Sequence, residues 1–282
     1  VLSALVELTD GVALGDIKLQ NSAMAQLANA LDLKTWPKAR HVYMVPAGQF
    51  HSVPWPALGL GQWVSLLPNA SWLLRDSPSG TGNLGQLVVG DPDFDGKLPQ
   101  LPGARIEACQ ISRQYRVEPL LGKQATPSAI FARSRKKLGV LHLATHGLFD
   151  HQQPLKSALF FTKPGGGVQA LTAEDVFRQP VRADLVVLSA CETGVGQVQA
   201  DNDLLGLQRS FYMNGASQMV NTLWPVSDGA AQAFMTVFHA NLDQGTGEAI
   251  RKAVDFSRKA GNPPSVYAAF VLNGYTSKGL KP

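Results

Sequence analysis

Short apolar runs separated by helix-like segments are the feature that most limits how this chain can fold. Three such runs are Leu87–Gly90, Val140–Ala144 and Leu185–Ala190, and Gln218–Thr222 also reads as a strand. Continuous apolar runs of this length are typical of parallel strands that are buried on both faces. The sequence therefore predicts an α/β fold, with a doubly wound, mostly parallel sheet and helices on both faces. The expected helices cover residues 105–116, 128–137 and 203–214, with others after Asp228.

The composition favours an ordinary globular protein and argues against two classes of partner. Hydrophobic residues make up 45% of the chain and charged residues 16%, and the net charge is only +4. The densest basic cluster, from Arg133 to Lys137, suits the end of a helix, and no aromatic residues alternate with it as in a nucleic-acid site. The sequence has no apolar run of about 18 residues and no secretion signal at its start. We expect a cytoplasmic protein without direct nucleic-acid or membrane contact, and the initial Val1 indicates a piece of a longer chain.

The first third of the chain reads as a region separate from the rest. Residues 1–35 have a helical, Ala- and Leu-rich pattern, and the segment His41–Val45 reads as a short strand. The segment Ser77–Gly85 has the Gly, Ser and Pro content of a linker. The predicted division is an N-terminal region over residues 1–83 and a catalytic core over residues 84–282.

Two of the apolar runs end in residues suited to nucleophilic chemistry. The run at 140–144 leads into His146 and Gly147, and the run at 185–190 leads into Cys191 and Glu192. Functional groups of a parallel sheet collect beyond the carboxyl ends of its strands. If the two strands are neighbours, their spacing of about 4.8 Å brings a thiol and an imidazole within reach of one substrate carbonyl. The sequence predicts His146 as base and Cys191 as nucleophile.

Both residues have a clear chemical use in acyl transfer. A free thiol is only a few per cent thiolate at neutral pH, and an adjacent imidazole raises that fraction. The backbone N–H groups of Gly147 and Cys191 are candidates for an oxyanion hole.

The remaining Cys and His residues have structural interpretations. Cys109 lies in a helix-like segment and is expected to pack inward, so no disulfide with Cys191 is predicted. His142 lies inside its strand and reads as a hydrogen-bonded core residue. A metal site built from His142, His146, His151 and Cys191 lacks the close ligand spacings of known sites, so no cofactor is expected. The glycines 165–167 indicate a hairpin or loop.

The sequence resembles the CHAT domains, caspase-like bacterial modules related to caspases and separase and often attached to tetratricopeptide repeats. The resemblance implies a cysteine endopeptidase fold in which His146 and Cys191 match the catalytic pair and Gly147 matches the glycine beside the oxyanion site. It also implies that residues 1–83 form a degenerate, non-catalytic, caspase-like companion that packs against the catalytic core. Cys191 follows His146 by 45 residues, close to the spacing of about 50 in caspases. The matching stretches are His41–Leu58, Gly90–Phe94, Leu101–Glu107, Val140–Gly147, Asp184–Gly194, Gly215–Asp228 and Ala268–Gly274.

Two segments depart from the family pattern. The segment Gln197–Leu205 carries Asp201 and Asp203 where the family has a Gly-Glu-Gly-like turn, and Asn262–Tyr267 replaces a His-Pro…Trp pattern. Together with Glu192, these two acidic residues are candidates to line a substrate groove.

The expected specificity follows from the position two residues before the nucleophile. Some peptidases of related folds that cleave after Arg or Lys place an Asp there, whereas this chain has Ser189. An uncharged residue before the scissile bond is therefore expected, unless Asp201 or Asp203 supplies the charge.

The sequence leaves three functional classes open. The first is a peptidase that acts on a protein or peptide substrate, with a regulatory partner or an attached repeat domain. The second is a scaffold without turnover, or a latent enzyme, and the third is acyl transfer or ester hydrolysis by the same pair.

Overall fold

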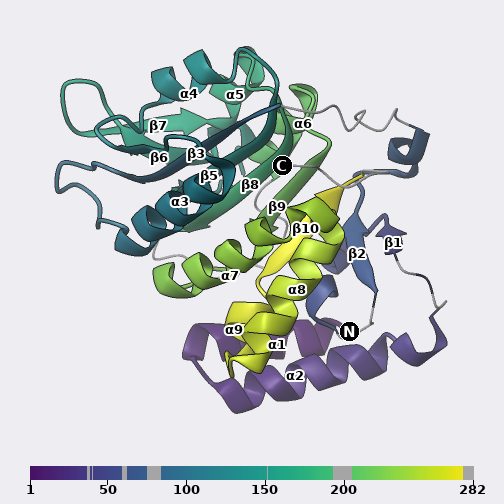
Figure 1. Ribbon diagram of the computed structural model, residues 1–282. Coiled ribbons are helices and arrows are strands. Elements are labelled where there is room, and N and C mark those ends of the chain that lie inside the picture. The colour runs from purple at the N-terminus through teal and green to yellow at the C-terminus, as the bar shows by residue number, and fades with distance from the viewer. Residues whose placement is uncertain are drawn as a thin grey trace.

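The computed structural model describes residues 1–36, 39, 41–58, 62–74, 84–150, 152–192 and 205–275, with the backbone alone for residues 190–192 and 205. Ten described strands form one sheet in the order β1-β2-β10-β9-β8-β5-β3-β4, and β6 and β7 extend it from β5 (Figure 1). The pairs β10–β9, β5–β6 and β6–β7 are antiparallel, and the other pairs are parallel. The strands are β1 His41–Met44, β2 Trp63–Leu66, β3 Gly85–Pro92, β4 Leu120–Gly122, β5 Leu138–Leu148, β6 Ala158–Thr162, β7 Val168–Thr172, β8 Ala183–Glu192, β9 Gln218–Thr222 and β10 Phe270–Gly274.

Helices cover both faces of this sheet. In Figure 1, α4, α5 and α6 lie on one side, whereas α3, α7 and α8 lie on the other. The α-helices are α1 Leu2–Leu14, α2 Ile17–Ala30, α3 Pro102–Tyr115, α4 Pro127–Arg133, α5 Ala173–Arg178, α6 Leu205–Met213, α7 Asp228–Ala240, α8 Thr246–Lys259 and α9 Pro264–Tyr267. Short 3₁₀ helices cover Leu33–Thr35, Gly48–Ser52, Trp55–Ala57, Ala70–Leu74, Pro154–Lys156 and Leu242–Gln244.

The two hydrophobic clusters follow directly from the alternation of side chains along the central strands. Val140 and Val187 belong to the cluster with α3, α7 and α8, whereas their neighbours Leu141 and Val186 belong to the cluster with α4, α5 and α6. Successive side chains of a strand point to opposite faces, so a strand between two helical layers must be apolar at every position. The predicted fold class and its central strands are confirmed.

The helix after Asp228 is confirmed, but its predicted buried face is rotated. The sequence predicts an apolar stripe through Ala230, Ala233, Phe234, Val237 and Phe238. The buried residues of α7 are instead Ala231, Phe234, Met235, Phe238 and His239. The rotation brings His239 into the core. Its burial is possible because Tyr115 and His142 are polar partners of its ring.

The expected glycine turn is present, whereas several other expected features lie outside the described residues. The glycines 165–167 form the turn of the β6–β7 hairpin, where all three have positive φ. Most of the expected linker, Ser77–Gly85, lies outside the described residues, and so do His151, Asp201 and Asp203.

The proposed division at residue 83 stays a prediction. In the described residues, β1 and β2 join the same sheet through β10, where Leu272 pairs with Ser65. No described helix is both long and apolar enough to span a membrane.

One buried glutamine ties the N-terminal helices to the C-terminal part of the chain. Gln20 of α2 is 1% exposed, and its Nε2 donates to the carbonyl of Gly11 at 2.9 Å. Its Oε1 accepts the N–H of Ser265 in α9, also at 2.9 Å. Figure 1 shows α1, α2 and α9 together at one end of the molecule, away from α4 and α5. Residues about 250 positions apart in sequence therefore belong to one packed layer.

We expect the free energy of unfolding to fall as the pH is lowered from about 6.5 towards 3. Burial lowers the pKa of His41, which stacks on Trp63, from 6.5 to about 3. Burial also lowers the pKa of His51 and, together with the nearby His142, that of His239. In this pH range the unfolded chain binds protons at these positions and the folded chain does not, so acid favours unfolding.

Denaturant unfolding at pH 7.5, 6 and 5 measures this effect. The variant His41→Phe retains an aromatic ring and removes a buried Nε2 that has no hydrogen-bond partner among the described residues. Its stability should depend less on pH than that of the unaltered chain. An equal dependence in the two proteins would mean that His41 is not a source of the effect.

Candidate functional site

The backbones of His146 and Cys191 lie directly opposite each other in neighbouring strands. In the parallel pair β5–β8, His146 pairs with Cys191, Thr145 with Ala190 and Gly147 with Glu192. Adjacent strands are about 4.8 Å apart, and residues in register point to the same face. The expectation that these two strands are neighbours is confirmed. The side chains of Cys191 and Glu192 lie outside the described part of the structure.

The imidazole of His146 is held by a backbone carbonyl. Its Nε2 lies 2.8 Å from the carbonyl oxygen of Pro99, and the ring of Phe94 packs beside it at a centroid distance of 5.0 Å. A carbonyl oxygen only accepts, so Nε2 carries the proton of this hydrogen bond. In the neutral ring Nδ1 is then the unprotonated nitrogen, which is the form a general base requires.

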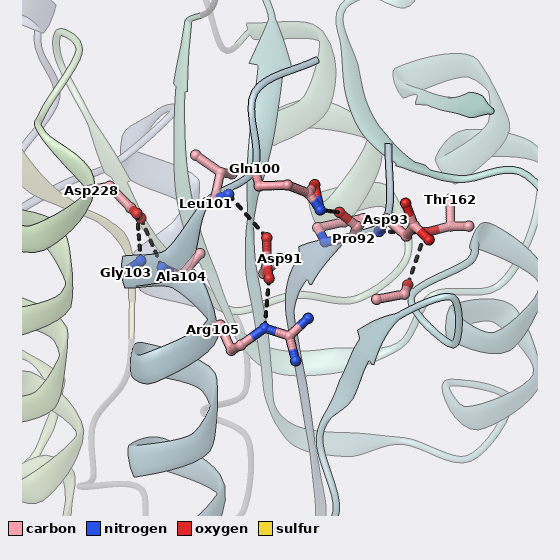
Figure 2. A network of polar contacts seen from close by, with 11 residues as sticks. Asp91, Pro92, Asp93, Gln100, Leu101, Gly103, Ala104, Arg105, Thr162 and Asp228 are labelled. Carbon is pink, nitrogen blue, oxygen red and sulfur yellow. Dashed lines mark hydrogen bonds and ion pairs between the residues drawn. The ribbon is translucent and has the colours of Figure 1, made fainter. Parts of the chain in front are cut away.

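A network around Asp91 fixes the loop that carries Pro99 (Figure 2). Asp91 has a positive φ of 42°, and its Oδ1 accepts the N–H of Leu101 at 2.9 Å. Its Oδ2 accepts from Nε of Arg105 at 2.7 Å. One buried carboxylate at the end of β3 therefore holds the far end of the loop and the first turn of α3.

The same loop is attached to β6 at its beginning. The N–H of Asp93 donates to Oγ1 of Thr162 at 2.8 Å, and that hydroxyl donates in turn to the carbonyl of Gly122. Both ends of the loop between β3 and α3 are thus anchored, as Figure 2 shows. The position of the Pro99 carbonyl follows from these anchors.

Asp228 caps a helix other than its own. The sequence places Ser227 and Asp228 at the N-cap of α7, but Ser227 makes no side-chain cap there. The carboxylate of Asp228 instead accepts the N–H groups of Gly103 and Ala104, at 2.5 and 2.7 Å (Figure 2). A Cβ at Gly103 would lie 2.6 Å from this carboxyl group, so glycine is needed for the approach. Negative charge at a helix N-terminus is favourable, and α3 has no side-chain cap of its own.

A small pocket lies beside His146. Its walls come from β5, β8, the first turns of α3 and the start of α7. Ser189 of β8 lines it, on the same face as His146, because residues 189 and 191 alternate with 190. The lining residues are Leu101, Ala104, Glu107, Thr145, His146, Ser189, Val226, Asp228 and Ala231.

The structure also describes three other residues considered from the sequence, which are Gly147, His142 and Cys109. Gly147 lies between two strands, paired with Leu159 of β6 and with Glu192 of β8. His142 is confirmed as a core residue, fully buried, with contacts to Glu107 and His239. Cys109 is only half-buried and not packed inward, because Glu107 and Ala108 occupy the inward positions of α3.

Sequence reasoning missed Pro99, Asp91, Asp228 and Glu107 as parts of the site. A carbonyl that orients a histidine has no residue signature, so Pro99 could not be found from its side chain. The stretches Gly90–Phe94, Leu101–Glu107 and Gly215–Asp228 did stand out as matching stretches, and three of these four residues lie in them.

Comparisons with known proteins give a family and a fold. The sequence model of the CHAT domain matches residues 17–275. Tetratricopeptide repeat protein 28 of Mus musculus is 27% identical over 261 residues, which cover 74% of this chain and 10% of the relative. The protein of the same name from Homo sapiens is 26% identical, over 66% of this chain and 9% of the relative. This chain thus spans about a tenth of the length of these two relatives, which are mammalian rather than bacterial.

Two solved structures share the fold at low sequence identity. One is the Saccharomyces cerevisiae separase–securin complex, with a TM-score of 0.52 and 14% identity over 83% of this chain and 15% of that chain. The other is the Arg-specific cysteine proteinase gingipain R, with a TM-score of 0.52 and 10% identity over 91% of this chain and 67% of that chain. At this identity the likeness establishes the mostly parallel, caspase-like α/β fold.

Proposed function

The chain belongs to the CHAT domain family, and we propose that it is a cysteine endopeptidase that cleaves a protein partner with His146 as base and Cys191 as nucleophile. The observation that carries the proposal is the register of β5 and β8, which pairs the two backbones directly. The carbonyl of Pro99 supports it, because it fixes His146 in the tautomer with a free Nδ1.

The proposed reaction follows the usual two steps of a thiol peptidase. His146 Nδ1 takes the proton from Cys191, and the thiolate sulfur bonds to the scissile carbonyl carbon. The imidazolium then gives the proton to the leaving amine as the C–N bond breaks. Water, deprotonated by the same imidazole, hydrolyses the thioester and releases the acid. The N–H groups of Cys191 and Gly147, at the carboxyl ends of the paired strands, are the proposed donors to the oxyanion.

The comparisons support a protein as the substrate or regulator. The matched relatives are named for tetratricopeptide repeats, and one structural neighbour is a separase in complex with securin. We infer that a protein partner or an attached repeat domain delivers the substrate or activates the site. Glu192, Asp201 and Asp203 remain the proposed residues of the substrate groove.

A cleavage assay with a matched variant tests the proposal. The protein is incubated with a peptide library and with a whole proteome, alone and with an attached repeat domain, beside Cys191→Ala. New peptide termini that appear only with the unaltered protein are the expected result. If no condition gives a difference, the domain is a scaffold without turnover. Cleavage of thioesters or esters alone would instead identify an acyl transferase or esterase.

The same assay measures the residue before the cut. Ser189 lines the pocket, Asp228 is engaged by two amide N–H groups and Glu107 faces His142, so neither described carboxylate is free for a cationic side chain. We expect substrates with an uncharged residue before the scissile bond to be cleaved with a kcat/KM at least about tenfold higher than substrates with Arg or Lys there. The reason is that an unpaired charge in a buried pocket is costly. Selective cleavage of Arg-terminated reporters would contradict this and point to Glu107 or the undescribed Asp201 and Asp203.

A further inference from the structure

A pair of small residues lies directly below residues 146 and 191 in the sheet. On the face that α3 and α7 cover, the next pair along β5 and β8 is Ala144 and Ser189. The pair after that is His142 and Val187, and both of these bulkier side chains are fully buried. Small side chains above a bulky pair leave a hollow at the carboxyl ends of the two strands.

The helices that face this hollow also present small residues to it. Ala104 of α3 and Ala231 of α7 line the pocket, together with Val226 from the segment before α7. These three residues are buried, whereas Ser189 and Leu101, which also line the pocket, are partly exposed. The pocket therefore has a closed, apolar end and is reached from the side of Ser189.

The width of the pocket is fixed by a contact between its two helices. Asp228, at the start of α7, accepts the N–H groups of Gly103 and Ala104 at the start of α3 (Figure 2). Hydrogen bonds to a charged acceptor are about twice as strong as those between neutral groups. Separating the two helices at this end would break both bonds, so a side chain that enters must fit the existing space.

The existing space is small. The pocket has a volume of about 50 Å³. On the same scale one water molecule needs about 10–15 Å³, so the pocket has room for about three to five non-hydrogen atoms. The side chains of Ala, Ser, Thr and Val fit this space, whereas an aromatic ring does not. Forcing extra atoms into a well-packed site displaces its walls at a cost in free energy.

The pocket is within reach of the residue whose carbonyl is attacked. A strand rises about 3.3 Å per residue, so Ser189 lies about 6.6 Å along β8 from Cys191. In the proposed reaction the sulfur bonds to the carbonyl carbon of the residue before the scissile bond, and the Cα of that residue is about 1.5 Å from this carbon. Its side chain can therefore extend from the bond under attack into the hollow at Ser189.

We propose that this pocket receives the side chain of the residue before the scissile bond and selects it by size, accepting small uncharged side chains. Ala231 and Val226 are then specificity-determining residues, because a longer side chain would meet the walls that they form. The inference rests on the proposed peptidase function and adds a limit on size to the expected preference for an uncharged residue. Phe, which is uncharged but large, separates the two requirements.

A series of peptide chloromethyl ketones tests the inference by the rate at which each modifies Cys191. The thiolate displaces chloride and forms a thioether, so no turnover is needed. The probes differ only in the residue next to the ketone, which is Ala, Thr, Phe or Arg. Peptide mapping gives the adduct at Cys191, and the adduct at the half-buried Cys109 corrects for the intrinsic reactivity of each probe. The Ala and Thr probes should react at least about tenfold faster than the Phe probe, because a single methylene group in a hydrophobic pocket is worth about tenfold or more.

Two substitutions change the size of the pocket in opposite directions. Val226→Ala widens it and should raise the rate of the Phe probe relative to the Ala probe by about tenfold. Ala231→Val narrows it and should slow the Thr probe by about tenfold, with a smaller effect on the Ala probe. The control is Ala233→Val, which adds the same atoms to the same helix at a partly exposed position outside the lining and should change neither ratio.

Equal rates for the Ala, Thr and Phe probes at Cys191 overturn the inference and leave the peptidase proposal standing. Faster reaction of the Phe or Arg probe overturns it as well, and so does a preference for small residues that neither pocket variant alters. If Ala231→Val does not fold, Val226→Ala decides. If a small alkylating reagent modifies Cys191 and none of the peptide probes does, the peptidase proposal fails and this inference fails with it.

Discussion

Replacing His146 by Ala should slow the alkylation of Cys191 at pH 7 by about tenfold or more. Without the imidazole the thiol returns towards an ordinary pKa near 8.5, where only a few per cent is thiolate. The thiolate is the form that reacts with a small alkylating reagent. The direct pairing of residues 146 and 191 across β5 and β8 is the structural reason for expecting so large an effect.

Cys109 serves as the internal control for this experiment. It is half-buried on α3 and is described as a free thiol, so its rate should be lower than that of Cys191 and unaffected by His146→Ala. Peptide mapping after a brief treatment gives both rates from one sample. Labelling of Cys109 before Cys191, or an unchanged rate at Cys191 in the variant, would mean that the pair does not operate in the isolated chain.

Replacing Asp228 by Ala should lower the free energy of unfolding by about 2 kcal/mol. The change removes the acceptor of two N–H groups at the start of α3, and a lost helix cap costs about 0.5–2 kcal/mol. The two bonds are charge-assisted and partly buried, which places the effect at the upper end of that range. Asp228→Asn keeps one carbonyl acceptor and should cost about half as much.

The adjacent serine provides a matched comparison. Ser227 precedes α7, is exposed and makes no side-chain cap, so Ser227→Ala should change the stability by less than about 0.5 kcal/mol. Denaturant unfolding curves of the three variants give the comparison directly. If Ser227→Ala costs as much as Asp228→Ala, the cap on α3 is not the source of the stability. Asp228→Ala should also reduce cleavage, because the loop that carries Pro99 ends at this helix.

The central strands and the positions of the two reactive residues could be predicted because their signals are local. A run such as Val140–Ala144 is too short for a typical helix and favours a strand between two apolar layers, and it carries His146 to the edge of the sheet. The link of β10 to β2 depends on contacts between residues that are about 207 positions apart, such as Leu272 and Ser65. No local pattern records such contacts.

The rotated face of α7 shows how a polar contact can override an apolar pattern. Periodicity alone favours Val237 over His239 as the buried residue, yet His239 is buried between Tyr115 and His142. The cap from Asp228 to α3 was missed for a related reason. An aspartate next to the start of a helix is assigned to that helix by default, and only the fold reveals that its carboxylate points elsewhere.

The pairing of β10 with β2 has a consequence for any attempt to divide the molecule. β10 lies between β9 and β2 in the described sheet, so cutting the chain at residue 83 would leave it as an outer strand. Its residues are buried, and Phe270 and Leu272 are each 0% exposed. An apolar strand with one unsatisfied row of N–H and C=O groups recruits strands from other molecules. In the described sheet, the N-terminal segment therefore covers an edge of β10 that would otherwise favour self-association.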